Sequence, residues 1–137
     1  MKVGPEGFLQ SPDLHDGVLT ALDLVDEKIL RIRARDVRGG KHLIELHGLS
    51  LLLADEFRQG NIILDVRFET ARAPDEQAIR YLLGEPPAGE PFRSKYESHV
   101  RKLIQSIANG ELTLVTIGSS YGCSLTALCR KAVVHES

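Results

Sequence analysis

Alternation of apolar and polar residues between Leu14 and Phe68 is the feature that most constrains the fold of this chain. Four stretches show it, at residues 14–26, 28–36, 41–48 and 61–70, and short turns separate them. Side chains alternate between the two faces of a β-strand, so each stretch predicts a strand with one face toward a core. The four stretches together predict an antiparallel sheet built from hairpins.

The apolar rows also predict the register of the hairpins. The first turn is centred on Glu27, because this brings Leu22 opposite Ile32. The second turn is centred on Gly39, where Arg-Gly-Gly supplies the glycines that a three-residue loop prefers. In the fourth stretch, alternation assigns Ile62, Leu64, Val66 and Phe68 to the core and Asp65, Arg67 and Glu69 to the outer face.

A row of arginines projects from the outer face of the second stretch. Arg31, Arg33 and Arg35 recur at a spacing of about 6.6 Å, which suits binding of phosphates or of an acidic protein. The predicted register also places Asp23 beside Arg31 and Glu45 beside Arg33, so the row can neutralise itself. We favour this second interpretation, because charged outer faces are normal for antiparallel sheets. The three arginines remain the candidate binding residues.

Residues 49–60 allow two interpretations. Ser50 can cap a short helix that Gly60 ends, with leucines and Phe57 as its buried stripe. The alternative is a strand extension through residues 49–53, because short apolar runs fit either structure.

Two longer helices are predicted further along the chain. Asp75 caps the first, and Gly84 ends it. Ser94 and Glu97 form a capping-box pair at the start of the second, whose apolar face continues to Asn109. The second helix is expected to lie across the sheet.

The C-terminal part predicts a closing hairpin. Residues 112–117 form a strand, a glycine-bounded turn follows, and we favour a second strand over a helix for residues 123–134. Cys123 and Cys129 lie about 20 Å apart along such a strand, too far for a disulfide, whose Cα atoms lie within about 7 Å. Both are therefore expected as buried thiols in a reducing compartment.

The composition indicates one domain over residues 1–137, with residues 1–12 as a loosely ordered arm. A net charge of −2 gives no field that attracts nucleic acid or a membrane, and the absence of Trp disfavours base stacking. No apolar run is long enough to span a membrane. We therefore expect a cytoplasmic protein that binds no cofactor, nucleic acid or membrane.

Ser120 is the candidate for a catalytic residue, because residues 118–122 match the G-x-S-x-G pattern of serine hydrolases. That pattern follows a strand and leads into a helix, with an acid and then a histidine further along the chain. Here only His135 and Glu136 follow, in the opposite order. A glycine-rich hairpin turn is the simpler interpretation.

His15 and Asp16 are the candidates for metal ligands. A His-Asp pair is found in metal-dependent phosphohydrolases, but a catalytic metal site usually needs three protein ligands. His42 and His47 cannot both bind the same metal ion, because they are five residues apart and an odd spacing places them on opposite faces of a strand. The expected alternative is a local role at the turn, with no metal bound.

Several short segments resemble a known group of proteins. The His15-Asp16 start, the segment HGLSLLLADEFRQGNIILDV at residues 47–66 and the closing GCSLTALCRKAVV at residues 122–134 carry the likeness. The chain is similar there to small bacterial proteins of the toxin-immunity type and to uncharacterised β-rich relatives. The helical region at residues 75–109 departs from their pattern. The resemblance implies a non-catalytic protein that binds another protein.

The sequence thus predicts an α+β fold, with a mostly antiparallel twisted sheet of about six strands and two or three helices packed on it. The first functional hypothesis is a cytoplasmic protein that acts by contact with another protein or with itself. The alternatives are a small hydrolase that uses Ser120 or a His15/Asp16 metal site, and an anion-binding module that uses the arginine row.

Overall fold

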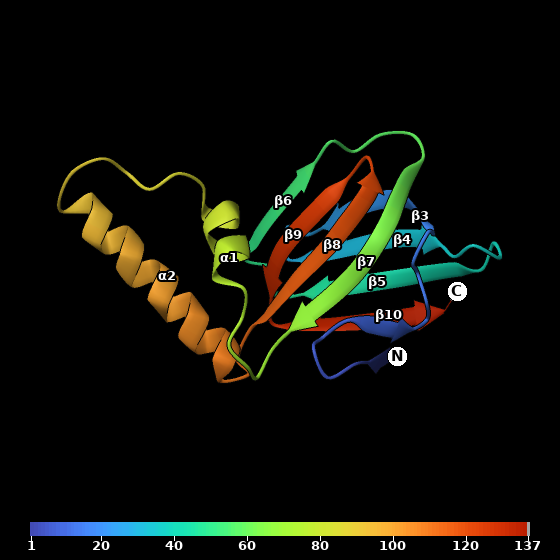
Figure 1. Cartoon of the computed structure of the whole chain (residues 1–137), viewed down its shortest axis with the longest axis horizontal. Coiled ribbons are helices and arrows are strands. Elements are labelled where there is room, and N and C mark those ends of the chain that lie inside the picture. The colour runs from blue at the N-terminus through green and yellow to red at the C-terminus, as the bar shows by residue number, and fades with distance from the viewer. Residues whose placement is uncertain (137) are drawn as a thin grey trace.

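The computed structural model describes the backbone of residues 1–136 and the side chains of residues 1–135, and it shows an α+β fold with a mostly antiparallel sheet, which confirms the predicted class (Figure 1). The described elements are β1 (Lys2–Val3), β2 (Leu9–Ser11), β3 (Val18–Val25), β4 (Ile29–Arg35), β5 (Lys41–His47), β6 (Leu51–Asp55), β7 (Asn61–Glu69), α1 (Glu76–Leu83), α2 (Phe92–Ala108), β8 (Thr113–Tyr121), β9 (Ser124–Cys129) and β10 (Lys131–Glu136). None of the helices in residues 1–136 has the length and apolarity needed to cross a membrane.

Eight strands form the main sheet in the order β10-β5-β4-β3-β7-β8-β9-β6, and β1 and β2 form a separate pair. The predicted number of about six strands is therefore wrong. The N-terminal pair lies where a loosely ordered arm is expected from the sequence. Breaks at residues 48–50 and at Arg130, also not predicted, divide two long segments into β5 and β6 and into β9 and β10.

The two divided segments close the sheet on itself. β5 pairs with β10 and β6 pairs with β9, and backbone hydrogen bonds continue the pairing across both breaks. Ser50 N donates to Leu128 O and Arg130 N donates to His47 O, each at 2.9 Å. Residues 41–55 and 124–136 thereby run side by side and link β4 to β8, and the β3–β7 pairing completes the ring. Figure 1 shows the result, with β7 and β8 in front of β3, β4 and β5.

The core lies inside this closed sheet, and β4 shows why. Leu30, Ile32 and Ala34 of β4 are buried there, while Arg33 and Arg35 are exposed on the outside. The remaining strands follow the same rule and contribute Leu19, Ile44, Leu46, Ile63, Val66, Phe68, Val115, Ile117, Leu125, Ala127 and Cys129. Cys123 and Cys129 are free and buried, as predicted.

The predicted register of the first hairpin is confirmed. Leu22 lies opposite Ile32, and Asp23 lies opposite Arg31. The turn at residues 26–28 is centred on Glu27, whose backbone φ is 62°.

The predicted register of the second hairpin is wrong by two residues. Its turn spans the five residues 36–40, because Asp36 Oδ1 accepts the backbone N–H groups of Arg38 and Gly40, both at 2.9 Å. This side-chain bonding of an aspartate within its own turn is a common way to hold a loop. As a result Glu45 lies opposite Arg31 and not beside Arg33.

The predicted alternation in β7 fails at its start. The pairing with β8 shifts register around Ile63, so Ile63 enters the core and Leu64 is 45% exposed. Glu69, expected on the outer face, is buried, and its Oε2 accepts the backbone N–H of Asp75 at 3.1 Å. The bulge near Ile63 accounts for Ile63 and Leu64, because an inserted residue reverses the faces of its neighbours and a strict two-residue period does not anticipate it.

Of the two interpretations of residues 49–60, the strand is confirmed as β6 and the short helix is wrong. Pairing with β9 lets β6 bury apolar side chains on both of its faces: Leu52 packs on the core and Leu51 packs toward the helices. Phe57, assigned to the buried stripe, is 48% exposed.

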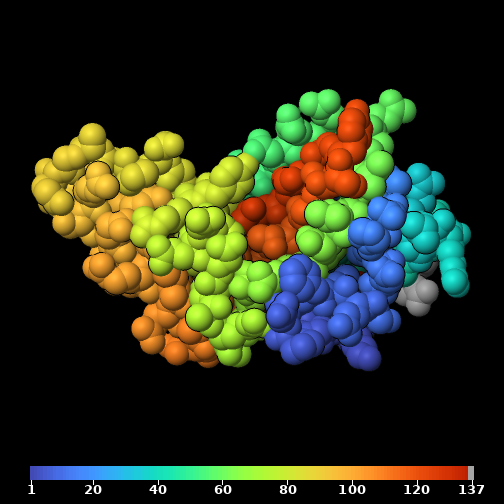
Figure 2. Space-filling view, viewed as in Figure 1, coloured from blue at the N-terminus to red at the C-terminus, as the bar shows by residue number. Residues whose placement is uncertain are grey.

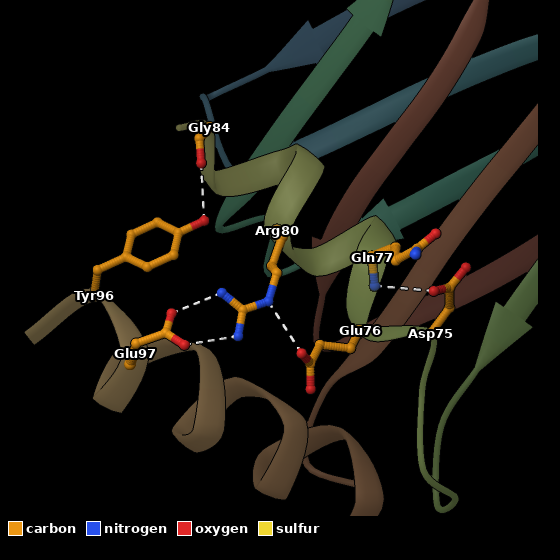
Figure 3. Close-up of polar contacts among 7 residues, drawn as sticks. All are labelled: Asp75, Glu76, Gln77, Arg80, Gly84, Tyr96 and Glu97. Atoms are coloured by element: carbon orange, nitrogen blue, oxygen red, sulfur yellow. Dashed lines mark hydrogen bonds and ion pairs between the residues drawn. The ribbon is translucent and has the colours of Figure 1, made fainter. Parts of the chain in front are cut away.

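The caps of α1 are confirmed, since Asp75 accepts the N–H of Gln77 at 3.0 Å and Gly84 follows the last residue. The capping box of α2 is wrong, because the helix begins at Phe92, two residues before Ser94. Glu97 instead accepts two hydrogen bonds from Arg80, as Figure 3 shows.

Helix α1 packs on β6 and β9, whereas α2 packs mainly on α1 and projects from one end of the sheet, so the expectation that α2 lies across the sheet is wrong (Figure 1). Ile79 of α1 and Val100 and Ile107 of α2 form a second apolar cluster with Leu114 of β8 and Leu128 of β9. Figure 2 shows α2 and the preceding loop (orange and yellow) standing apart from β6 (green), with a hollow between them. The N-terminal hairpin (dark blue) lies by β7, where Phe8 pairs with Arg67.

Candidate functional site

The helices leave the outer face of β3, β4, β5 and β10 uncovered, because they pack over β6, β8 and β9 (Figure 1). We call this surface the helix-free face. Strand alternation and cross-strand pairing place the following side chains on it: Asp23, Arg31, Arg33, Arg35, Lys41, Leu43, Glu45, His47, Lys131, Val133 and His135.

Glu45 neutralises the central part of the helix-free face. Its Oε2 accepts a hydrogen bond from Arg31 Nε at 3.1 Å, and its Oε1 lies 2.9 Å from His135 Nε2 and 3.9 Å from His47 Nε2. The Arg31 guanidinium, with His135 as a smaller contributor, holds the pKa of the Glu45 carboxyl below its usual value. One of the three predicted binding arginines is therefore engaged within the protein.

The other two arginines are placed differently. Arg33 lies between Ala21 and Leu43, and Arg35 lies between Val18 and Lys41 on the neighbouring strands. The described residues provide no ion-pair partner for Arg33, Arg35 or Lys41, and all three are exposed. The helix-free face is therefore basic near the C-terminal end of β4 and the N-terminal end of β5.

These cations line a groove formed by two adjoining hollows. One has a volume of about 380 Å³ and contains Arg33 and Lys41 in its wall. The other has a volume of about 690 Å³ and is lined on its far side by Phe57 and Arg58. Thr20 and Arg35 belong to both hollows. We call residues Thr20, Arg33, Arg35, Lys41, Phe57 and Arg58 the basic groove.

The wall of the groove formed by β3 has an irregular backbone. The pairing of β3 with β4 shifts register at Thr20, whose hydroxyl donates to the backbone oxygen of Arg33 at 3.1 Å. That hydroxyl is therefore used to hold the two strands together, and the guanidinium groups are the principal donors of the groove.

Asn61 holds the far wall of the groove in place. Its side-chain oxygen accepts the N–H groups of Arg58 at 2.7 Å and Cys123 at 3.0 Å. Its amide nitrogen donates to the backbone oxygens of Arg58 and Leu19, at 2.5 and 3.2 Å. The Asn61 side chain is 1% exposed, so these bonds satisfy a buried amide and fix the loop at residues 56–60. Asn61 was not predicted as a functional residue, although an Asn after Gly60 at the start of a strand is a turn signal.

Arg58 is less available to a ligand than Arg33 or Arg35, because it already has contacts within the protein. Its guanidinium lies 3.4 Å from Glu56 Oε1 and 5.8 Å from the centre of the Tyr121 ring. The exposed Phe57 beside it gives this end of the groove an apolar surface.

A second buried polar group was also missed from the sequence. His42 is 4% exposed, and its Nε2 lies 2.8 Å from Asp36 Oδ2. The hydrogen bond with His42 makes the largest contribution to lowering the pKa of the Asp36 carboxyl below its usual value. The bond from the Gly40 N–H group makes a smaller contribution in the same direction. Nδ1 of His42 has no hydrogen-bond partner among the described residues. The pair anchors the turn that presents Lys41.

The structure places His15 and Asp16 at the surface. His15 Nδ1 donates to Leu64 O at 2.7 Å, and its Nε2 lies 3.5 Å from Asp16 Oδ2. The bond to Leu64, and then the charge of Asp16, raise the pKa of His15. Among the side chains of residues 1–135, no group of three or more His, Cys, Asp or Glu is arranged to hold a metal ion.

Ser120 lies near the tip of the β8–β9 hairpin. It is the extra residue where the pairing of β7 with β8 shifts register, and its side chain is exposed. The G-x-S-x-G segment therefore leads into a strand and not into a helix. Its neighbour Ser119 donates to Gly122 O at 3.1 Å and lies 2.9 Å from Ser124 Oγ. The hydroxyl of Ser120 has no hydrogen-bond partner in the described part of the chain.

Comparisons of the chain with protein-family models, with curated proteins and with solved structures find no match.

Proposed function

We propose that this protein acts without chemistry of its own, by binding an acidic surface of another protein through its helix-free face. The observation that carries the proposal is that the arginines of β4 differ in their contacts. Arg31 is engaged by Glu45, whereas Arg33, Arg35 and Lys41 are exposed without a carboxylate partner in the described residues.

The position of these cations favours binding over a merely solvated surface. Their side chains project from paired strands, whose backbone is already ordered. Binding of a partner therefore costs little backbone conformational entropy. Guanidinium groups bind carboxylates through paired hydrogen bonds, which gives directional contacts as well as charge attraction. The toxin-immunity resemblance implies the same kind of function, a protein that binds another protein.

The hydrolase alternatives receive less support from the geometry. Ser120 lies on a hairpin, with no histidine bonded to it among the described residues, and His15 is directed to a backbone oxygen. Neither arrangement contains the nucleophile–base contact or the three ligands that such chemistry uses.

Quantitative affinity enrichment from cell extract tests the proposal. The baits are the wild-type protein, the R33S/R35S variant, and an R101S/K102S variant that removes two exposed cations from α2 as a control with the same charge change. Thermal unfolding of each bait checks that the variants remain folded.

We expect at least one acidic protein to be enriched by the wild type and by the α2 control, and to be lost with R33S/R35S. The interaction should weaken as salt is raised, because exposed charges are screened. Identical enrichment by all three baits would contradict the proposal, as would the absence of any specific partner. Size-exclusion chromatography of the same proteins shows whether the partner is a second copy of this chain.

A further inference from the structure

We infer that the basic groove receives an extended protein segment in which two acidic side chains alternate with other residues and an apolar side chain follows. This inference rests on the proposed function and names the kind of segment that the helix-free face would bind.

The spacing of the cations sets the spacing of the acids. Arg33 and Arg35 are two residues apart on one face of β4, a separation of about 6.6 Å. An extended peptide places every second side chain on the same face at the same spacing. Two carboxylates at positions i and i+2 of such a peptide therefore match the two guanidinium groups, while carboxylates at i and i+1 point in opposite directions.

The two positions differ in strength. Arg35 lies directly opposite Lys41 in the β4–β5 pairing and belongs to both hollows, so two cations meet the acid at this position. Arg33 lies opposite Leu43, so Arg33 is the one cation among the described residues that would contact the acid at this position. The acid nearer Arg35 should therefore contribute more to binding.

The far end of the groove sets the third position. Beyond Arg35 the larger hollow is bounded by Phe57, which is 48% exposed, and by Arg58, which already faces Glu56 and Tyr121. An apolar side chain two residues beyond the second acid would reach this hollow on the same face of the peptide. Its contact with Phe57 would remove apolar surface from water, which is favourable.

The rigidity of both walls supports the inference. The strand wall is held by the hydroxyl of Thr20 on the oxygen of Arg33, and the loop wall by Asn61 on both backbone groups of Arg58. A groove that is formed before binding costs less ordering when the segment enters.

Fluorescence anisotropy with short labelled peptides tests the inference. The probe is Gly-Glu-Gly-Glu-Gly-Leu-Gly, and two matched peptides are Gly-Glu-Glu-Gly-Gly-Leu-Gly, with adjacent acids, and Gly-Glu-Gly-Glu-Gly-Ser-Gly, without the apolar residue. The proteins are the wild type, R33S/R35S, F57S and the α2 control R101S/K102S.

We expect the wild type and the α2 control to bind the alternating probe about tenfold more tightly than the adjacent-acid peptide, a difference of about 1.4 kcal/mol. R33S/R35S should lose binding of every peptide. F57S should bind the probe and the serine peptide equally, because it removes only the apolar contact.

Three outcomes overturn the inference. Equal binding of the alternating and adjacent-acid peptides shows that charge alone acts. Displacement of the probe by inorganic phosphate, at an ionic strength where chloride has no effect, assigns the groove to phosphate groups. Absence of peptide binding, while a partner protein is still lost on changing Arg33 and Arg35, overturns the inference but leaves the proposed function standing.

Discussion

Arg31 Nε donates to Glu45 Oε2 at 3.1 Å, and this contact decides how the arginine row of β4 is used. The two residues face each other across β4 and β5 because the turn between these strands contains five residues. With a three-residue turn, Glu45 would lie beside Arg33, and the groove would lose one of its two exposed guanidinium groups. The length of the turn thus controls the charge of a surface on the neighbouring strands.

Replacing Glu45 with Gln should make the protein less sensitive to acid. Arg31, and to a smaller extent His135, lower the pKa of Glu45 in the folded state from its ordinary value of 4.5. A carboxyl with a lowered pKa stabilises the fold above its unfolded pKa, and this stabilisation is lost as the pH falls through the folded pKa. We therefore expect the urea midpoint of the wild type to fall more steeply below pH 4.5 than that of E45Q. Parallel curves would contradict the assigned role of this ion pair.

Replacing Asn61 with Ala should cost about 3 kcal/mol of unfolding free energy, because it leaves buried backbone groups without hydrogen-bond partners. The affected groups belong to Leu19, Arg58 and Cys123. Urea unfolding measures the loss, and amide chemical shifts should change at residues 56–60 and 122–123. Asn109→Ala, at the exposed end of α2, is the control and should change stability by only about 0.5 kcal/mol. An equal effect of both substitutions would show that Asn61 does not hold the loop.

Replacing Glu97 with Gln should loosen the contact between the helices. Glu97 accepts hydrogen bonds from Arg80 Nη1 at 2.6 Å and Nη2 at 2.9 Å, and Arg80 Nε also donates to Glu76 at 3.0 Å (Figure 3). These bonds cross from α1 to α2, so their loss should lower the thermal midpoint by a few degrees and speed proteolysis at residues 84–91. Glu111→Gln, which changes an exposed carboxylate after α2, is the control. Unchanged proteolysis of E97Q would contradict a role in fastening α2.

The two thiols should be unreactive in the folded protein. Burial raises the pKa of Cys129 to about 11 and also raises the pKa of Cys123, so neither forms the reactive thiolate at neutral pH. Ellman's reagent should label neither cysteine within minutes under native conditions and both at once in guanidinium chloride. Rapid labelling of the native protein would show that the β8–β9 hairpin opens readily.

Ser120 should not react with a fluorophosphonate probe. Its hairpin position lacks a general base to accept its proton in the described structure, and an unactivated serine hydroxyl is a weak nucleophile. Mass spectrometry of the folded protein after incubation measures any adduct. Stoichiometric labelling that disappears in Ser120→Ala would restore the hydrolase alternative.

Local patterns predicted those parts of the fold that depend on neighbouring residues. Alternation assigned Leu30, Ile32 and Ala34 to the core, and cap chemistry placed α1 between Asp75 and Gly84. These features follow from the pleat of a strand and from the backbone groups at a helix end, and both act over a few residues. The arginine row was recognised for the same reason.

Tertiary structure decided which side chains meet. The pairing of residues 41–55 with residues 124–136 brings His135 to the same carboxylate as Arg31, and the bulge at Ile63 exposes Leu64. Sequence periodicity specifies the face on which a residue lies, but not the partner across the ladder, because register depends on turn length and on packing of the whole core. The sequence by itself therefore determined that Arg31, Arg33 and Arg35 share an outer face. Only the folded structure decided that Arg31 is neutralised, through the register that the five-residue turn gives to β4 and β5, and that the other two line a groove.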